Sequence, residues 1–314
     1  MIKAKTKLVL LNKSTDTVQL LCAFLLKDHS LKLAILLQYI APKLLITSLA
    51  GKLANKPLGA LTTRFIAWFV NRYQVNMAEA ENPDIASYKT FNIFFTRPLK
   101  SGARPLAETD FICPVDGAIS QFGPIQQDQI FQAKGHEYTT TTLLAGNQKL
   151  ANQFTNGHFA CLYLSPKDYH RIHMPCDGKL ISMAYVPGDL FSVNPTTAEN
   201  VPDLFARNER VVCEFESEQH GTFVMVLVGA TIVGSMATVW HDTQSKVINP
   251  PRSKQVRTWQ YKEQNIILKQ GEEMGRFLLG STVVMLFEQN KIQFNNNWRP
   301  AKTIRLGEEM GKKD

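Results

Sequence analysis

The feature that most constrains the fold is a change in sequence texture near residue 104. Before it, apolar residues recur near helical spacing, as in residues 31–56 and 58–73. After it, short runs rich in β-branched and aromatic residues, such as 158–165 and 222–234, are separated by Gly, Pro, Asn and Asp. The pattern predicts an α+β chain, in which N-terminal amphipathic helices precede a β-rich, sandwich-like domain.

Two pairs of similar stretches lie in the strand-rich part. CPVDGAIS (113–120) resembles MPCDGKLIS (174–182), and GEEMG occurs at 271–275 and again at 307–311. Each member of the first pair places Asp-Gly directly before a strand-like run, which is typical of a turn followed by a strand. The repetition predicts internal pseudo-repeats in the β-rich domain.

The positive charge of the chain is confined to its first third. Residues 1–104 carry 15 Lys and Arg against 5 Asp and Glu, whereas residues 105–314 carry 20 against 22. Such asymmetry suggests a polyanionic partner, either a membrane or a nucleic acid. The basic residues accompany apolar helix faces and form no stripe, so we expect no nucleic-acid binding.

The helical segments fit two environments. Pro42 should kink or split the helix predicted at 31–56. In the second helix we expect one apolar face, made of Leu61, Phe65, Trp68, Phe69 and Tyr73. No stretch reaches 18 apolar residues without a charge, so a spanning helix is not expected. The helices could pack on the rest of the protein or lie in a bilayer interface, and the basic excess favours the interface.

The cysteines argue against disulfides and zinc. They are five in number and scattered, with no CxxC pair, at Cys22, Cys113, Cys161, Cys176 and Cys213. This usage is typical of reduced thiols in the cytosol, and we expect neither a metal site nor a disulfide framework. The N-terminus shows no pattern of a cleavable signal.

An apolar strand, FLLGSTVVMLF (277–287), carries Gly280 and Ser281 in its middle. A hydroxyl there could act with a base, His170 or His173 in YHRIHMP (169–175), and a carboxylate, Asp116, as in Asp–His–Ser sites. The GxSxG elbow of serine hydrolases is absent. A hydroxyl so placed can instead attack its own preceding peptide bond, because glycine permits the strained geometry.

Longer motifs add a resemblance to the phosphatidylserine decarboxylases, in their bacterial membrane-bound branch. It rests on LGST and extends from about residue 40 to 310, through SYKTFNIFFTRPLK (87–100), CPVDGAISQFG (113–123), AKGHEYT (133–139), YLSPKDYHRIHMPCDG (163–178), YVPGDLFSVN (185–194), LFARNERVV (204–212), VGATIVGSMATVW (228–240) and KQGEEMGRF (269–277). It implies an extension at 1–27, a helical membrane-associating region at 28–104 and a catalytic domain at 105–314.

The resemblance implies a self-processing proenzyme. Asp116, His173 and Ser281 would form the processing triad. Asp177, in the similar turn at 174–178, would have only a turn role. Cleavage between Gly280 and Ser281 would give a β chain, 1–280, and an α chain, 281–314, whose first residue becomes a covalent pyruvoyl group. That group would form a Schiff base with phosphatidylserine and replace pyridoxal phosphate as electron sink, with no metal.

The resemblance also implies roles around that group. His170 would reprotonate the product, phosphatidylethanolamine, and the headgroup would contact Tyr163, Phe191, Ser192 and Asn194. The partners would be phosphatidylserine in the membrane and the two cleaved chains as a heterodimer, with further dimerisation left open. The place would be the cytoplasmic side of the cell membrane, bound peripherally. A soluble pyruvoyl-dependent amino-acid decarboxylase and a non-catalytic lipid-binding β-sandwich are the alternatives.

Overall fold

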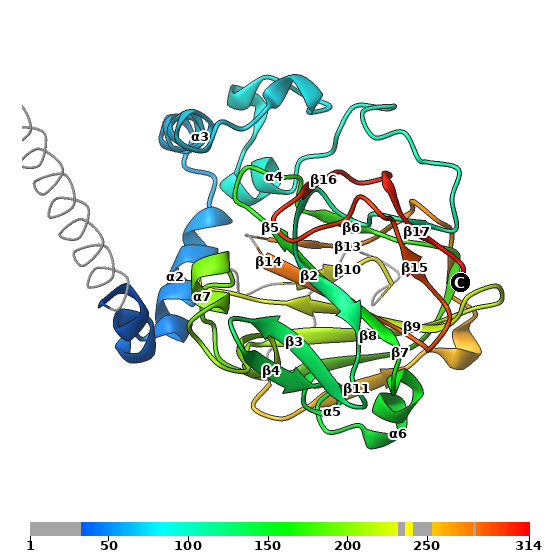
Figure 1. The fold of residues 1–314 in the computed structure, drawn as a ribbon. Coiled ribbons are helices and arrows are strands. Elements are labelled where there is room, and N and C mark those ends of the chain that lie inside the picture. The colour runs from blue at the N-terminus through cyan, green and yellow to red at the C-terminus, as the bar shows by residue number, and fades with distance from the viewer. Residues whose placement is uncertain (1–32, 232–235, 241–252, 279–280) are drawn as a thin grey trace, which may run out of the picture. The chain divides into compact units, whose positions relative to one another are not determined.

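The computed structural model describes residues 33–231, 236–240, 253–278 and 281–314. The chain divides after Pro42 into two compact units. The described part of the first unit contains the helix Leu33–Ile40, and the second unit, Lys43–Asp314, contains the sheets. The predicted extension, 1–27, lies outside the described residues, and the predicted boundary at 104 stays a prediction. N-terminal helices followed by antiparallel sheets confirm the α+β class (Figure 1).

The helices of the second unit are concentrated before residue 96. The longest are α2 (Lys43–Ala54) and α3 (Ala60–Tyr73), and α4 (Phe91–Phe95) follows two 3-10 turns, η1 (Met77–Glu79) and η2 (Ile85–Ser87). The shorter helices lie among the strands: α5 (Thr140–Leu143), α6 (Gln148–Ala151), η3 (Asn152–Phe154), α7 (Pro195–Ala198), α8 (Leu204–Arg207) and η4 (Lys262–Gln264). As predicted, Pro42 separates α2 from the preceding helix.

All strand pairings between named strands are antiparallel. The largest sheet has the order β11-β7-β8-β9-β14-β5-β2-β16, and β12 also pairs with β7. Two three-stranded sheets, β1-β17-β15 and β10-β13-β6, and the hairpin β3-β4 complete the domain. The bounds are β1 (Phe111–Ile112), β2 (Gly117–Pro124), β3 (Gln129–Ala133), β4 (His136–Thr139), β5 (His158–Leu164), β6 (Arg171–His173), β7 (Gly178–Val186), β8 (Arg210–Ser217), β9 (Gly221–Val228), β10 (Met236–Thr238), β11 (Arg257–Gln260), β12 (Ile267–Leu268), β13 (Glu273–Phe277), β14 (Ser281–Phe287), β15 (Gln293–Phe294), β16 (Thr303–Ile304) and β17 (Glu309–Lys312).

The predicted pseudo-repeats are confirmed as two sets of four strands. In one set β17 pairs with β1 and β16 pairs with β2. In the other, β13 pairs with β6 and β12 pairs with β7. The two similar turns are the links from β1 to β2 and from β6 to β7. Each repeat therefore contributes a short strand, an Asp-Gly turn and a long strand of the large sheet.

The two turns are joined to each other by reciprocal backbone hydrogen bonds. His173 N–H donates to Pro114 O at 2.9 Å, and the equivalent residue, Ile112, donates to Pro175 O at 3.0 Å. The exchange brings the backbone of the histidine-bearing strand β6 against the turn that carries Asp116. The pseudo-symmetry thus explains how residues far apart in the sequence reach one site.

The helices α2 and α3 present apolar residues to solvent. On α2 the buried residues include Lys43 and Thr47, whereas apolar side chains are exposed, namely Leu44, Leu45, Ile46, Leu49 and Leu53. On α3, Leu61, Phe65 and Trp68 are exposed while Ile66 and Phe69 are buried. The sequence prediction that Phe69 shares one face with Trp68 is therefore wrong, because α3 carries apolar residues on two faces.

The buried face of α3 packs on α4 through an aromatic cluster. The Phe69 ring lies 5.1 Å from that of Phe91 and 6.0 Å from that of Phe94, in edge-to-face geometry. Thr90 caps α4, because its hydroxyl accepts a hydrogen bond from Ile93 N. This packing holds α4 and the residues that follow it in fixed positions. Among the described residues no single helix can cross a membrane, and only Leu33–Ile40 and Lys43–Ala54 counted together meet the length and composition required.

Candidate active site

Ser281 is the first residue of β14, a fully buried strand between β5 and β9. It pairs with Leu164, the last residue of β5. The residue is 1% exposed, and its Oγ has no hydrogen-bond partner among the described residues. A buried hydroxyl without a partner is costly, and such groups in native proteins call for an explanation. Gly280 lies outside the described residues.

The loop 165–170 leaves β5 beside Ser281 and carries His170 at its end. Its imidazole is fully buried, and the ring of Phe95 lies 4.0 Å away. Nδ1 lies 2.8 Å from Asp168 O, so it carries the hydrogen and Nε2 presents its lone pair. Within the described residues Nε2 has no partner. Burial lowers the pKa of His170 to about 3, so the ring is neutral near pH 7.

His173 is held in the same tautomer. Its Nδ1 lies 2.8 Å from Gly271 O, and its Nε2 lies 3.2 Å from the hydroxyl of Tyr169. Burial also lowers the pKa of His173. A neutral imidazole whose Nε2 carries the lone pair is the form that a general base requires, and here the Tyr169 hydroxyl faces that lone pair. Gly271 adopts a φ of +80°, which only glycine adopts readily.

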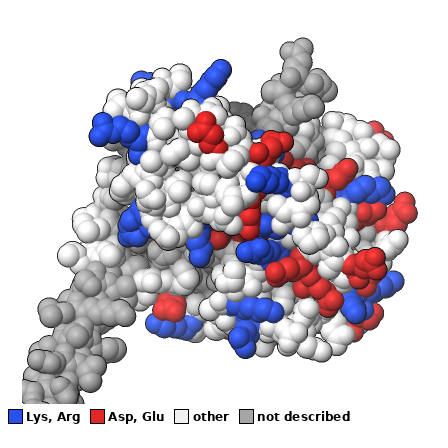
Figure 2. Space-filling view, turned by 90° about the horizontal axis from the view of Figure 1, so that it is seen from above, with Lys and Arg blue, Asp and Glu red and all other residues white. Residues whose placement is uncertain are grey.

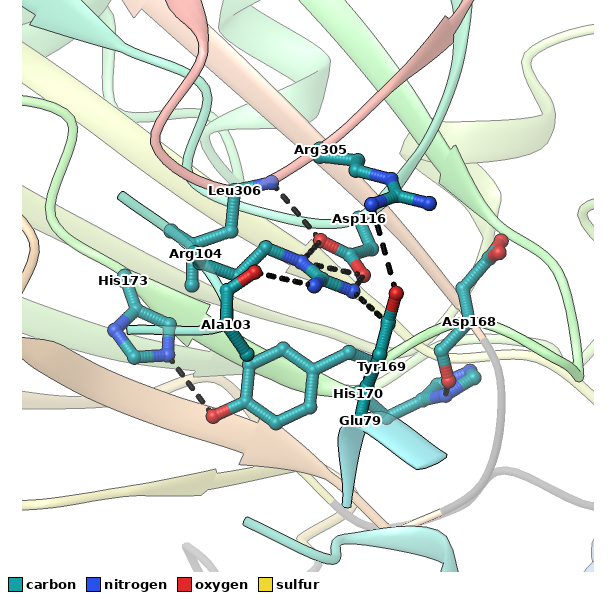
Figure 3. A network of polar contacts seen from close by, with 10 residues as sticks. All are labelled: Glu79, Ala103, Arg104, Asp116, Asp168, Tyr169, His170, His173, Arg305 and Leu306. Atoms are coloured by element: carbon teal, nitrogen blue, oxygen red, sulfur yellow. Dashed lines mark hydrogen bonds and ion pairs between the residues drawn. The ribbon is translucent and has the colours of Figure 1, made fainter. Parts of the chain in front are cut away.

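Asp116 is anchored by a buried arginine (Figure 3). Arg104 Nε lies 2.9 Å from Asp116 Oδ1, and its Nη2 lies 2.5 Å from Oδ2. Leu306 N–H donates to Oδ1 at 2.9 Å. Arg104 also binds Glu79 at 2.7 Å, and Arg305 lies 3.5 Å from the same carboxylate. The hydrogen bonds to Asp116, followed by those to Glu79, raise the pKa of Arg104 despite its burial.

The predicted triad is brought together only in part. Asp116 uses its carboxylate on Arg104 and Leu306, and His173 uses its ring nitrogens on Gly271 and Tyr169. Tyr169 lines the same cavity as Asp116 while its hydroxyl contacts His173. The link between the carboxylate and the imidazole is therefore indirect: Tyr169 contacts His173 and lines the cavity that Asp116 also lines, and the two turn backbones exchange hydrogen bonds. Burial raises the pKa of Tyr169 to about 12, so its hydroxyl stays protonated.

The predicted headgroup residues lie in two places. Tyr163 lines a cavity of about 400 Å³ together with Ser165 and Asp168. Phe191 is fully buried, with Lys43 Nζ 3.9 Å and the Arg207 guanidinium 5.0 Å from its ring centre.

The other two headgroup candidates follow Phe191. Ser192 is half-buried, and Asn194 caps α7 by accepting hydrogen bonds from Thr197 N and Oγ1 at 2.8 and 3.0 Å. The described residues contain no group of three or more His, Cys, Asp or Glu that could hold a metal ion.

Comparison of the sequence with known proteins identifies the family of this chain. A family model described as phosphatidylserine decarboxylase matches residues 91–312. The chain belongs to the phosphatidylserine decarboxylase family. A second model, described as PSD, matches residues 33–74. A phosphatidylserine decarboxylase proenzyme of Dechloromonas aromatica (strain RCB) is 69% identical over 280 residues, which cover 89% of this chain and 98% of that protein. One from Azoarcus sp. (strain BH72) is 66% identical, covering 89% and 96%.

In this family member, sequence reasoning missed three residues of the site. Arg104 and Glu79 come from the segment before β1, and Tyr169 directly precedes His170. The tyrosine stands in the YHRIH motif and could have been considered from its position alone. Nothing in the sequence marks Arg104, because its pairing with Asp116 depends on the path of the chain between η1 and β1.

Proposed function

We propose that this chain decarboxylates phosphatidylserine to phosphatidylethanolamine, using a pyruvoyl group that it makes from Ser281. The observation that carries the proposal is a pair of buried polar atoms without described partners, Ser281 Oγ and His170 Nε2. They come from the start of β14 and from the loop that leaves β5 beside it. Such atoms fit a site in which the serine hydroxyl reacts and the serine is converted into a new group, next to which the histidine exchanges protons with the substrate.

The processing step would use the residues of β14 and β6. His173 Nε2 takes the proton of Ser281 Oγ, which attacks the carbonyl carbon of Gly280 and breaks the C–N bond. The result is an ester and a free amine on Ser281. Elimination then releases the carboxyl group of residue 280, and one water replaces the nitrogen, which leaves as ammonia. The pyruvoyl carbonyl supplies the electron sink for loss of carbon dioxide from the substrate.

His170 would handle the proton during decarboxylation. Its hydrogen bond from Nδ1 to Asp168 O fixes the ring, and its Nε2 is free to accept. The substrate amine enters as an ammonium and must lose a proton before it reacts. His170 Nε2 takes that proton and returns one to the α-carbon after the carboxylate has left.

We propose that α2 and α3 bind the protein peripherally to the cytoplasmic face of the cell membrane. Exposed leucines on α2 and exposed aromatic residues on α3 support this, because they are typical of interfacial helices. Figure 2 views the molecule from the side on which α3 lies in Figure 1, and it shows Lys and Arg side chains around surface that is mostly uncharged and includes an acidic side chain. The cleaved α and β chains would remain together as a heterodimer, since β14 lies inside the largest sheet.

The proposal is tested by incubating the purified protein with vesicles that contain phosphatidylserine. We expect release of carbon dioxide and appearance of phosphatidylethanolamine by the wild type, and neither by Ser281→Ala. Free L-serine should be a much poorer substrate. Turnover of serine as fast as that of the lipid would support the soluble amino-acid decarboxylase, and no turnover of either would reject the proposal.

A further inference from the structure

A buried arginine near His170 has no anionic partner among the described residues. Arg97 follows α4 and is 3% exposed. Its Nε has no hydrogen-bond partner among the described residues. Its other contacts there are weak: Nη1 lies 3.5 Å from Phe94 O, and the guanidinium lies 5.2 Å from the centre of the Phe94 ring. By contrast, the part-buried Arg171 lies 2.8 Å from a carboxylate oxygen of Glu273.

An unpaired buried guanidinium is energetically unfavourable. Burial lowers the pKa of Arg97, yet an arginine stays charged at neutral pH. The desolvation cost of such a charge is usually offset by a carboxylate, a phosphate or a set of hydrogen bonds. The free hydrogen-bonding capacity of Arg97 therefore indicates an anion that binds from outside the chain.

Arg97 lines a cavity of about 200 Å³ whose other charges largely neutralise one another. Arg104 and Arg305 are matched there by Asp116 and Glu79. The remaining charged residues are Arg97 itself, the exposed Lys167 and Asp168. Burial raises the pKa of Asp168, and Ser165 N–H donates to its carboxylate at 2.7 Å. The cavity thus keeps positive charge for a ligand.

The cavity links the exposed helix face to the histidine. One part of its lining, Gln74 and Asn76, directly follows α3, and another part, Asp168 and Tyr169, directly precedes His170. The charge of Arg97 lies close enough to lower the pKa of His170 further. A ligand in this cavity would therefore lie within electrostatic range of the reacting site.

We propose that Arg97 binds the phosphodiester of the lipid headgroup and so orients the serine amine toward His170. The inference rests on the proposed function. A guanidinium presents a planar fork that matches two phosphate oxygens. We assign the phosphodiester rather than the substrate carboxylate to Arg97, because binding the group that must leave would stabilise the ground state rather than the transition state. Arg97 then selects the phosphorylated headgroup over free serine.

Calorimetric titration of the wild-type protein with three probes tests this assignment. Glycerophosphoethanolamine carries the phosphodiester without a carboxylate, and L-serine carries a carboxylate without a phosphate. Inorganic phosphate is the free anion, without ester groups and without a carboxylate. We expect glycerophosphoethanolamine to bind at least about 10-fold more tightly than the other two, as a charged hydrogen-bonded pair would require. Equal affinity of inorganic phosphate would indicate a free-phosphate site, and equal or tighter binding of serine would indicate a carboxylate site; either overturns the assignment.

Variants of Arg97 sharpen the test. Arg97→Gln should weaken glycerophosphoethanolamine about 10-fold or more and leave L-serine unchanged, whereas Arg97→Lys should retain part of the affinity. The matched control is Arg299→Gln, an exposed arginine, which should change neither. Unchanged glycerophosphoethanolamine affinity in Arg97→Gln, or loss confined to serine, overturns the inference.

Two features of the design separate loss of binding from loss of folding or of activity. Thermal unfolding of each variant reports whether it folds, and if Arg97→Gln fails to fold, the wild-type ratio and Arg97→Lys decide. Calorimetry needs no turnover, so the Arg97 site can be confirmed or rejected even in a protein that decarboxylates nothing. Failure of the proposed function and failure of this inference are thereby distinguished.

Discussion

Asp116 and Asp177 occupy equivalent turns and accept the same backbone hydrogen bond, but only Asp116 is buried. Leu306 N–H donates to Asp116 at 2.9 Å, and the equivalent Gln270 N–H donates to Asp177 at 2.8 Å. Asp177 is exposed, and a surface lysine lies 2.7 Å from it. Asp116 is 7% exposed and binds Arg104. The turn role is shared by both aspartates, and the buried ion pair is particular to Asp116.

The two aspartates therefore predict different mutant phenotypes. Asp116→Asn should abolish or strongly slow self-cleavage, because it removes one of the two carboxylates that pair with the Arg104 guanidinium and loosens the turn beside β6. Breaking a buried pair costs roughly 3–5 kcal/mol of stability. Asp177→Asn should process normally and lose little stability, because its partner Lys269 is exposed. Gel analysis and thermal unfolding of both proteins check this, and identical processing by the two variants would reduce Asp116 to a turn residue.

Tyr169 should assist cleavage through His173. Tyr169→Phe removes the hydroxyl that lies 3.2 Å from His173 Nε2. We expect self-cleavage to slow by about 2- to 10-fold, the value of one ordinary hydrogen bond, whereas His173→Ala should leave the chain almost uncleaved. The control is Tyr88→Phe, whose hydroxyl binds Asn82 O near the helices. A Tyr169→Phe protein that cleaves at the wild-type rate would show that the contact serves only packing.

His170 should make the fold sensitive to acid. Its pKa is about 3 in the folded chain and near 6.5 when unfolded, so between these values the unfolded chain binds a proton that the folded chain does not. The free energy of unfolding should therefore fall as pH falls from about 6.5 toward 3. His170→Gln should reduce the slope. Urea unfolding across this pH range measures it, and an unchanged slope would contradict the burial of a neutral His170.

The remaining pH dependence should come from other histidines that are partly or fully buried. Burial lowers the pKa of His173, His158 and His220 in the same direction. In His170→Gln we also expect normal self-cleavage, because His173 serves that step. Decarboxylation should drop by about 10²- to 10⁴-fold, as for loss of a positioned acid–base group. A single-turnover assay of the cleaved variant would measure this loss, and wild-type turnover would remove His170 from the reaction.

The two faces of α3 should respond differently to substitution. Phe65 and Trp68 are about half exposed, so replacing both by Ser should release the protein from phosphatidylserine liposomes without lowering cleavage. High salt alone should weaken binding only in part, because the apolar contribution persists. Phe69→Ala should instead destabilise the fold by roughly 3–5 kcal/mol, the cost of truncating a buried phenylalanine. Co-flotation and unfolding of both variants test this; retention of the double variant on liposomes would reject the interface.

How far the sequence predicted the structure depends on the range of the interactions. Strand texture and the two Asp-Gly turns are local signals, and they gave the α+β class and the pseudo-repeats. The exposed and buried faces of α3 could not be separated, because helical periodicity finds apolar stripes without saying which stripe meets the protein. Arg97 and Arg104 were missed for a related reason. Their importance lies in partners that they have or lack in three dimensions, which one-dimensional spacing does not report.

The mass of the purified protein tests the central claim most directly. If Ser281 makes the cofactor, intact mass spectrometry will find two chains that divide between Gly280 and Ser281. The smaller chain will be lighter than the peptide 281–314 by one ammonia, because its amino group has become a carbonyl. Its number of oxygen atoms is unchanged, since the serine hydroxyl oxygen leaves with the larger chain and water supplies the carbonyl oxygen. Ser281→Ala will give one uncleaved mass. A wild-type protein that stays whole, or a small chain with an ordinary serine amino terminus, would contradict the account.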